Sequence, residues 1–144
     1  MTNSHYLTAT FLLVVAAAPC MNVSHAGLYD RNHVAIRNAL EHNKTLKVHC
    51  KSKDNDLGFH LLGPDTVYRF KFHDNFGLST LYWCNLWQGP HYKHYQVFVA
   101  YRSIWFWRAD KTVMWEARED GIYEYVDDTH AVFKYKWDAP HKEN

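Results

Sequence analysis

The clearest alternation of hydrophobic and polar residues lies at residues 46–51, which read L-K-V-H-C-K. Leu46, Val48 and Cys50 fall on one face of an extended chain, and the polar residues between them fall on the other, so the period of two predicts a half-buried strand. Residues 52–56 are all polar, S-K-D-N-D. Asp and Asn favour turns because their side chains bond nearby backbone amides. We therefore expect a core strand that ends in a charged tip.

Short patterns of the same kind recur along the rest of the chain. Turn signals such as Gly63-Pro64-Asp65 and Gly89-Pro90 separate them, and convincing helical periodicity is absent after Ala26. Eight or nine short strands with turns every roughly 8–12 residues indicate an all-β sandwich or barrel. The expected strands are 34–40, 45–51, 59–62, 66–72, 80–87, 95–101, 113–117, 123–126 and 132–137.

The first 26 residues differ from the rest in composition, because they contain no Lys, Arg, Asp or Glu. Residues 8–18 form an apolar run that is too short to span a membrane but has the length of a signal-peptide core. Ser24-His25-Ala26 fits the small-x-small cleavage pattern, and a buried N-terminal helix is the alternative. We expect residues 1–26 to be a signal peptide and residues 27–144 to be one secreted, extracellular domain without membrane insertion.

Two further features agree with secretion. Of the three cysteines, Cys20 falls in the signal segment, which leaves Cys50 and Cys84 in the middle of two predicted strands. An even pair in a small secreted domain predicts a disulfide, with two buried free thiols as the alternative. Asn43-Lys44-Thr45 is a glycosylation sequon in the first turn, so we also predict an N-linked glycan on Asn43.

The charged residues give little sign of chemistry. The net charge is +1 with both signs interspersed, which argues against nucleic acid. The Asp54-Asn55-Asp56 segment lacks the rest of a calcium-binding loop. His91 and His94 lie between a Gly-Pro turn and a strand rather than on a helix, so this spacing does not favour a metal pair. We expect a monomer with no catalytic, cofactor or metal site.

Three sequence blocks resemble the plant self-incompatibility protein family, the S-protein homologues. They are L-x-V-H-C-K-S-K-D-x-D-L-G at 46–58, N-F-x-x-x-T-L-Y-W-C at 75–84 and D-G-I-Y at 120–123. The resemblance implies a small secreted antiparallel β-sandwich of immunoglobulin-like architecture, and some family members act as pollen-recognition ligands. The family pattern has a second cysteine pair ahead of D-G-I-Y; residues 103–115 contain none, which makes this chain a divergent member.

The resemblance predicts a secreted, non-catalytic ligand for a cell-surface receptor. Strands hold the core, so specificity is expected in loops, and the candidate recognition loop is Lys53, Asp54, Asn55 and Asp56. In the structural alternative for this loop, Asp54 or Asp56 caps the turn through backbone amides. The alternative function is an extracellular carbohydrate- or cell-wall-binding module that uses exposed aromatics. The aromatic run 105–107 is the candidate for such a surface, although most aromatic residues are expected to fill the core.

Overall fold

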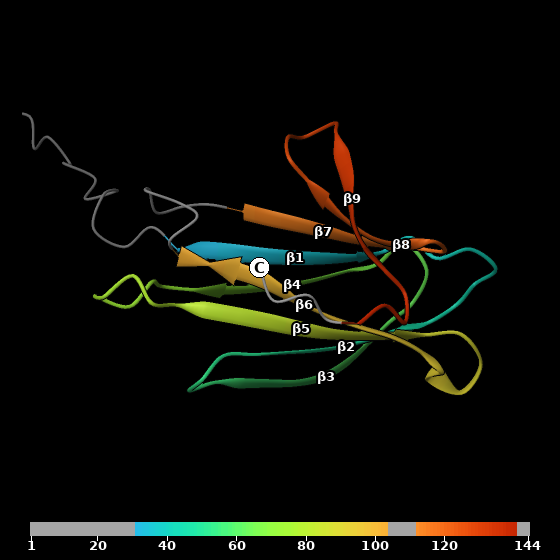
Figure 1. Ribbon diagram of the computed structural model, residues 1–144, viewed down its shortest axis with the longest axis horizontal. Coiled ribbons are helices and arrows are strands. Elements are labelled where there is room, and N and C mark those ends of the chain that lie inside the picture. Colours follow the sequence, from blue (N-terminus) through green and yellow to red (C-terminus); the bar gives the residue numbers. More distant parts are fainter. Residues whose placement is uncertain (1–30, 104–111, 141–144) are drawn as a thin grey trace, which may run out of the picture.

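The structure, a computed structural model, describes residues 31–103 and 112–140 (Figure 1). These parts form nine strands and one short 3-10 helix, and they contain no helix long and apolar enough to cross a membrane. Every expected strand is present, with ends displaced by a few residues. The elements are β1 (Asn32–Asn38), β2 (Leu46–Lys51), β3 (Asp56–Leu62), β4 (Val67–Phe72), β5 (Leu81–Gln88), η1 (Pro90–Tyr92), β6 (His94–Arg102), β7 (Thr112–Arg118), β8 (Gly121–Tyr125) and β9 (Ala131–Lys136).

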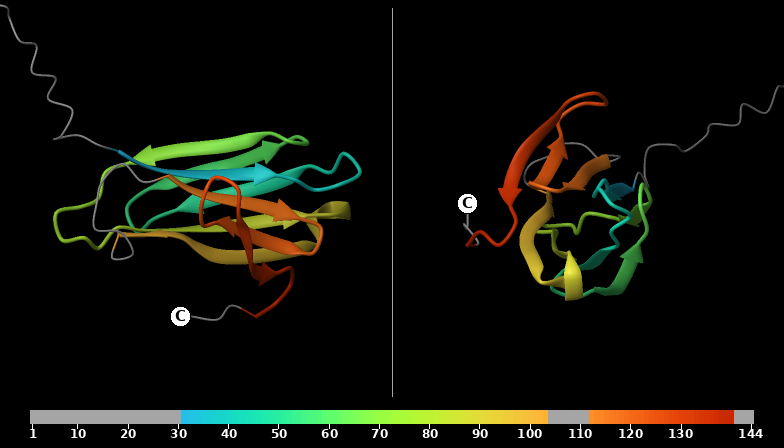
Figure 2. Two further views of the ribbon diagram at one scale, coloured as in Figure 1. Left: turned by 90° about the horizontal axis from the view of Figure 1, so that it is seen from above. Right: turned by 90° about the vertical axis from the view of Figure 1, so that its right-hand side faces the viewer.

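The strands form two sheets that enclose one core. One sheet has the order β4-β1-β7-β8-β9 and the other the order β3-β2-β5-β6, and the two layers are visible in Figure 2. The fold is therefore the expected β-sandwich. Every neighbouring pair is antiparallel except β1 and β7, which run parallel in the middle of the five-stranded sheet. The expectation of purely antiparallel pairing misses this pair, because hydrophobic alternation within a strand carries no information about its neighbours.

The core is built from the inward face of each sheet. β5 alternates strictly between partly exposed and buried residues, so Cys84 and Leu86 point inward together. Across the sandwich, the Trp115 ring of β7 lies 4.5 Å from the Phe98 ring of β6, and its indole Nε1 donates a 3.0 Å hydrogen bond to the Ala100 carbonyl. Burial of each large apolar side chain contributes about 1.5–3 kcal/mol to folding. Trp115 therefore joins the two sheets by packing and by a satisfied polar contact.

A buried asparagine closes one end of the sandwich. The Asn38 side chain donates through Nδ2 to the carbonyls of Lys44 and Leu62 at 2.9 Å each. Its Oδ1 accepts a 3.0 Å hydrogen bond from the Leu40 amide. A buried amide is stable only when its donors and acceptor are paired. Asn38 thus ties the end of β1 to the β1–β2 turn and to the end of β3.

Asp74 closes the opposite end. Its Oδ2 accepts hydrogen bonds from the Tyr101 hydroxyl at 2.8 Å and from the Asn32 side chain at 2.9 Å. Burial raises the pKa of Tyr101, and the neighbouring Asp74 carboxylate raises it further. Tyr101 therefore remains a neutral hydrogen-bond donor. The contact holds the start of the β4–β5 loop against both sheets.

The expected disulfide is present between β2 and β5. Cys50 and Cys84 are both fully buried and lie directly opposite each other in the antiparallel register. They are separated by 34 residues in sequence. Closing a loop of that length stabilises a fold by roughly 4 kcal/mol on the chain-entropy model. The bond is therefore a large contribution for a domain whose net stability is about 5–15 kcal/mol.

We expect the double variant Cys50→Ala/Cys84→Ala to lose about 2–5 kcal/mol of unfolding free energy, because the unfolded chain regains the freedom that the crosslink removes. Chemical denaturation of the secreted protein measures this, and non-reducing peptide mapping of the unaltered protein should recover the linked peptides. Unchanged stability of the variant, or two alkylatable thiols in the unaltered protein, would contradict the prediction.

Candidate recognition site

The predicted recognition loop lies at the turn between β2 and β3. Lys53, Asp54 and Asn55 are exposed, and Asp56 is the first residue of β3. The turn is closed by its own hydrogen bonds, since the Ser52 amide donates to the Asn55 carbonyl at 2.8 Å and the Asn55 amide donates to Ser52 Oγ at 3.1 Å. We call residues 52–55 the β2–β3 tip. The hydrophobic pattern alone predicts that β3 begins only at Phe59, so the strand is longer at its start than expected.

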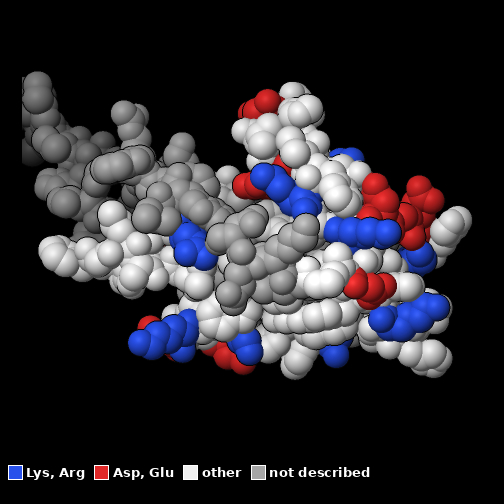
Figure 3. Space-filling model, in the orientation of Figure 1, with Lys and Arg blue, Asp and Glu red and all other residues white. Residues whose placement is uncertain are grey.

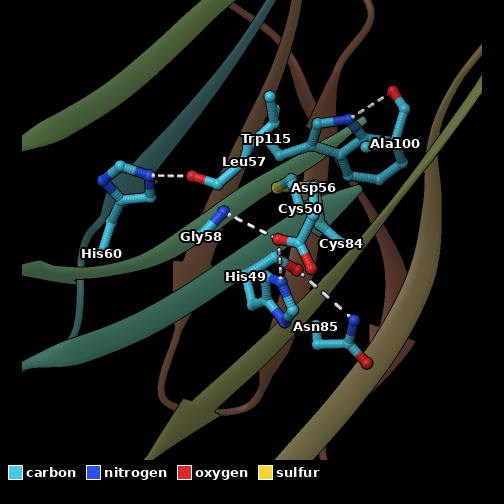
Figure 4. Close-up of a disulfide and its surroundings, with 10 residues drawn as sticks. All are labelled: His49, Cys50, Asp56, Leu57, Gly58, His60, Cys84, Asn85, Ala100 and Trp115. Atoms are coloured by element: carbon cyan, nitrogen blue, oxygen red, sulfur yellow. Dashed lines mark hydrogen bonds and ion pairs between the residues drawn. A yellow bond between two sulfur atoms is a disulfide. The ribbon is translucent and has the colours of Figure 1, made fainter. Parts of the chain in front are cut away.

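Asp56 anchors this tip. Its Oδ1 lies 2.6 Å from His49 Nε2 and accepts a 2.9 Å hydrogen bond from the Gly58 amide (Figure 4). The hydrogen bond with His49, followed by that from Gly58, lowers the pKa of the Asp56 carboxyl. Gly58 has a φ of 73°, a conformation that L side chains rarely adopt. Of the four predicted residues, Asp56 therefore has the structural role that the alternative interpretation described.

The disulfide lies directly behind the tip. Cys50 is joined to Cys84, and the next residue, Lys51, faces Asp56 on one side and Trp83 on the other. Figure 4 shows the His49–Asp56 pair beside the disulfide. The base of the tip is thus held by strand pairing on both sides and by a covalent crosslink.

The β4–β5 loop lies at the same end of the sandwich as the tip (Figures 1 and 2). The Asn75 side chain organises it, accepting a 2.7 Å hydrogen bond from the Ser79 amide and donating to Ser79 Oγ at 2.7 Å. Phe76 and Leu78 nevertheless point into solvent, and Phe76 is fully exposed. This end therefore presents a charged turn and two apolar side chains. The exposure of Phe76 and Leu78 could not be predicted from the sequence, because an apolar residue beside glycine in a loop gives no sign of which way it points.

A second surface covers the outer side of the β3-β2-β5-β6 sheet. The rings form a row across the strands: Phe59 and Trp87 have centroids 5.9 Å apart, and Trp87 and Tyr95 have centroids 5.3 Å apart. Phe59 is 60% exposed and Tyr95 37% exposed. We call this surface the aromatic face, and it comprises Lys47, Phe59, Trp83, Trp87, Tyr92 and Tyr95.

The sequence did indicate that tryptophans on β5 lie on this face, but the general expectation that aromatic residues fill the core pointed the other way. Trp83 and Trp87 alternate with Cys84 on β5, so a buried Cys84 requires both tryptophans to point outward. The expectation that aromatics fill the core holds for Trp115 and Trp137 but is wrong for Trp83 and Trp87, which are only partly buried. The run 105–107, the candidate exposed aromatic surface from the sequence, lies outside the described residues.

The predicted glycosylation site lies beyond the other end of the aromatic face. Asn43 is exposed in the β1–β2 turn with a φ of 55°. It lines a groove of about 570 Å³ together with Tyr92 of η1. A glycan on Asn43 would leave the protein surface beside Tyr92, and its presence remains a prediction.

Charges on the surface are mixed in sign. On the view in Figure 3, Lys and Arg side chains are interspersed with Asp and Glu side chains over both sheets. Ion pairs among the described residues include Lys134 with Glu124 at 2.9 Å and Arg118 with the buried Glu116 at 2.6 Å. Burial alone would raise the pKa of Glu119, but the Lys44 ammonium and the Glu41 amide lower it overall. In the described parts of the chain, no three His, Cys, Asp or Glu residues are grouped to hold a metal ion.

These features define a class: a small all-β sandwich with one buried crosslink and organised loops at its end. The family model described as plant self-incompatibility protein S1 matches residues 33–137. S-protein homolog 9 and S-protein homolog 11 of Arabidopsis thaliana are each 42% identical to the chain, covering 88% and 89% of it and 95% and 90% of the relatives. The chain therefore belongs to the plant self-incompatibility protein S1 family.

A solved structure agrees with this assignment. It is described as that of SPH (Self-Incompatibility Protein Homologue) proteins, "a widespread family of small, highly stable, secreted proteins from plants". The match has a TM-score of 0.64 at 26% sequence identity and covers 75% of this chain and 95% of that chain. The fold and the family predicted from the three sequence blocks are thus both confirmed.

We expect Asp56→Asn to lower the melting temperature at neutral pH. We also expect the unfolding free energy of this variant to fall less steeply than that of the unaltered protein as the pH is lowered. The folded-state pKa of Asp56 is lowered, so its carboxylate contributes stability above its unfolded-state pKa of about 3.9 and loses that contribution as pH falls through the folded-state value. Chemical denaturation from about pH 7 down to about pH 2 measures this window.

The matched control is Asp54→Asn, since Asp54 is exposed and forms no side-chain hydrogen bond with the described residues. Its stability curve should overlay that of the unaltered protein. An Asp56→Asn curve that overlays it as well would contradict the anchoring role of Asp56.

Proposed function

We propose that this protein is a secreted, non-catalytic recognition ligand whose β2–β3 tip is read by a cell-surface receptor. Membership of the plant self-incompatibility protein S1 family supports the role, and the related SPH proteins are described as secreted proteins from plants. The predicted signal peptide in residues 1–26 is consistent with the same location.

The β2–β3 tip is both charged and held in place, and this combination is the main support for the proposal. Lys53, Asp54 and Asn55 are exposed, while the turn hydrogen bonds, the His49–Asp56 contact and the disulfide fix their base. A loop that is ordered before binding avoids the ordering cost that a flexible loop incurs on association, which raises affinity. Exposed charges mainly set the encounter rate and the choice of partner.

The neighbouring β4–β5 loop supplies exposed apolar side chains, which the charged β2–β3 tip lacks. Binding energy at protein interfaces is concentrated in a few apolar and aromatic anchors surrounded by polar contacts. Phe76 and Leu78 are exposed on a loop that Asn75 and Asp74 hold by hydrogen bonds. We infer that a receptor contacts these apolar side chains together with the charged tip.

The proposed ligand must be secreted, which predicts that the signal peptide is removed. Intact-mass analysis of protein expressed in plant cells should show a mature chain that begins at Gly27, because Ser24-His25-Ala26 fits the cleavage pattern. A cytosolic product that retains Met1 would contradict the secretion that the ligand role requires.

A charge exchange tests the tip itself. We expect Lys53→Glu/Asp54→Lys to weaken binding to recipient cells at least about tenfold, equivalent to about 1.4 kcal/mol. Its melting temperature should stay close to that of the unaltered protein, because substitutions of exposed residues change stability by only about 0.5 kcal/mol. Asp56 is left unaltered, since it anchors β3.

The control is Lys93→Glu/Asp128→Lys, which makes the same exchange on exposed residues outside the tip. This variant should bind as the unaltered protein does. Full binding by the tip variant, or equal loss in both variants, would refute the tip as the recognition site.

A further inference from the structure

The aromatic face keeps large apolar groups in water, although the sandwich core below it is complete. Phe59 of β3 is 60% exposed and Tyr95 of β6 is 37% exposed, and Leu61, which lies opposite Lys47 in the β2–β3 register, is 64% exposed beside them. Contiguous apolar surface of this kind on a soluble domain marks a binding site for a protein, a membrane or a ligand. The row of Phe59, Trp87 and Tyr95 crosses the sheet near Lys47, toward the η1 end of β2, whereas Trp83 lies beside the β2–β3 tip. The row itself is therefore separate from the tip.

A lysine stands in the middle of these rings. Lys47 Nζ lies 4.5 Å from the Phe59 ring centroid, 5.3 Å from that of Trp87 and 5.6 Å from that of Tyr92. The three rings come from β3, β5 and η1, so the sheet register and the Gly89-Pro90 turn bring them together. Cation–π contacts hold the ammonium over the face without neutralising its charge.

The charge on Lys47 has no counterion among the described residues, since no described carboxylate lies within ion-pair distance of its Nζ. A second ammonium, that of Lys51, lies 5.8 Å from the Trp83 ring centroid on the same face. Two carboxylates that border these strands already have partners: Asp56 is bound by His49 and by the Gly58 amide, and Asp138 is bound by His94 and by the Tyr95 amide. The face therefore combines flat apolar rings with positive charge and favours a ligand that has flat apolar faces and negative charge.

We propose that the aromatic face binds an acidic polysaccharide, a chain of uronic acid residues. The apolar faces of the sugar rings would pack on Phe59, Trp87 and Tyr95, and a uronate carboxylate would bind the Lys47 ammonium. The ring row runs from β3 to β6 with successive centroid separations of 5.9 Å and 5.3 Å, so its three rings accommodate a chain rather than a single sugar.

A single-stranded nucleic acid is the other candidate ligand, because its bases also stack on aromatic rings. The small number of positive charges on the face favours the polysaccharide. Nucleic-acid sites follow the backbone with a positively charged groove. This chain has 16 Lys and Arg against 15 Asp and Glu, and two lysines hold their ammonium groups over the rings of this face. A sparsely charged glycan surface fits that arrangement better than a phosphate backbone does.

The test uses polygalacturonate fragments as the probe, with binding followed by calorimetry and by tryptophan fluorescence. The protein is first treated with glycosidase, because Asn43 shares a groove with Tyr92. We expect saturable binding, and we expect fully methyl-esterified fragments, which carry the same sugar without the charge, to bind at least about tenfold more weakly. Lys47→Gln and Trp87→Ala should each raise the Kd about tenfold.

Two controls match these variants. Lys71→Gln removes an exposed lysine from β4 of the other sheet, and Phe76→Ala removes an exposed ring from the β4–β5 loop. Both should bind polygalacturonate as the unaltered protein does. Phe59→Ser serves as a second ring variant if Trp87→Ala fails to fold, since Phe59 is already largely exposed.

Three results would overturn the proposal: no saturable binding of polygalacturonate, binding that Lys47→Gln and the ring variants leave unchanged, or equal affinity for polyglutamate or a single-stranded oligonucleotide. The last result would show that charge alone drives binding. The proposal goes beyond the receptor-ligand role and does not depend on it. The Lys53→Glu/Asp54→Lys variant, which leaves the aromatic face intact, should keep its affinity for polygalacturonate, so the two proposals fail separately.

Discussion

The antiparallel pairing of β2 with β5 determines what each face of the four-stranded sheet presents. Side chains alternate along a strand, so a slip of one residue would move every buried side chain to the surface. The Cys50–Cys84 disulfide joins two residues that lie directly opposite in this register. It fixes Val48 and Leu86 in the core and Lys47 and Trp87 on the outside. Both proposed binding surfaces depend on that choice.

The two faces of this sheet serve different purposes. Inward side chains such as Leu86 and Phe98 pack against Trp115 of the other sheet and account for much of the stability. Outward side chains add little to the core, yet several of them, such as Phe59 and Trp87, are large rings rather than the small polar groups that would suffice for solubility. The ring row around Lys47 is therefore better explained by binding than by folding.

Much of this arrangement could be predicted from the sequence, because it depends on local patterns. Alternation located every strand, and the even pair of cysteines indicated the crosslink. Contacts between distant segments could not be predicted in this way. The parallel β1–β7 pair and the His49–Asp56 contact both depend on which strands become neighbours. The His49–Asp56 contact also explains why β3 begins at Asp56 rather than at Phe59, since it draws the end of the predicted loop into the sheet.

The disulfide-bonded register turns Trp83 and Trp87 outward while Trp115 stays in the core. Hydroxyl-radical footprinting of the native protein, read by peptide mass spectrometry, measures this directly. With oxidation assigned to single residues by fragmentation, the register predicts that Trp83 and Trp87 of β5 are oxidised readily. Trp115 of β7 should be protected until the protein unfolds, whereas its partly exposed neighbour Met114 need not be. Protection of the β5 tryptophans together with oxidation of Trp115 in the native protein would contradict it.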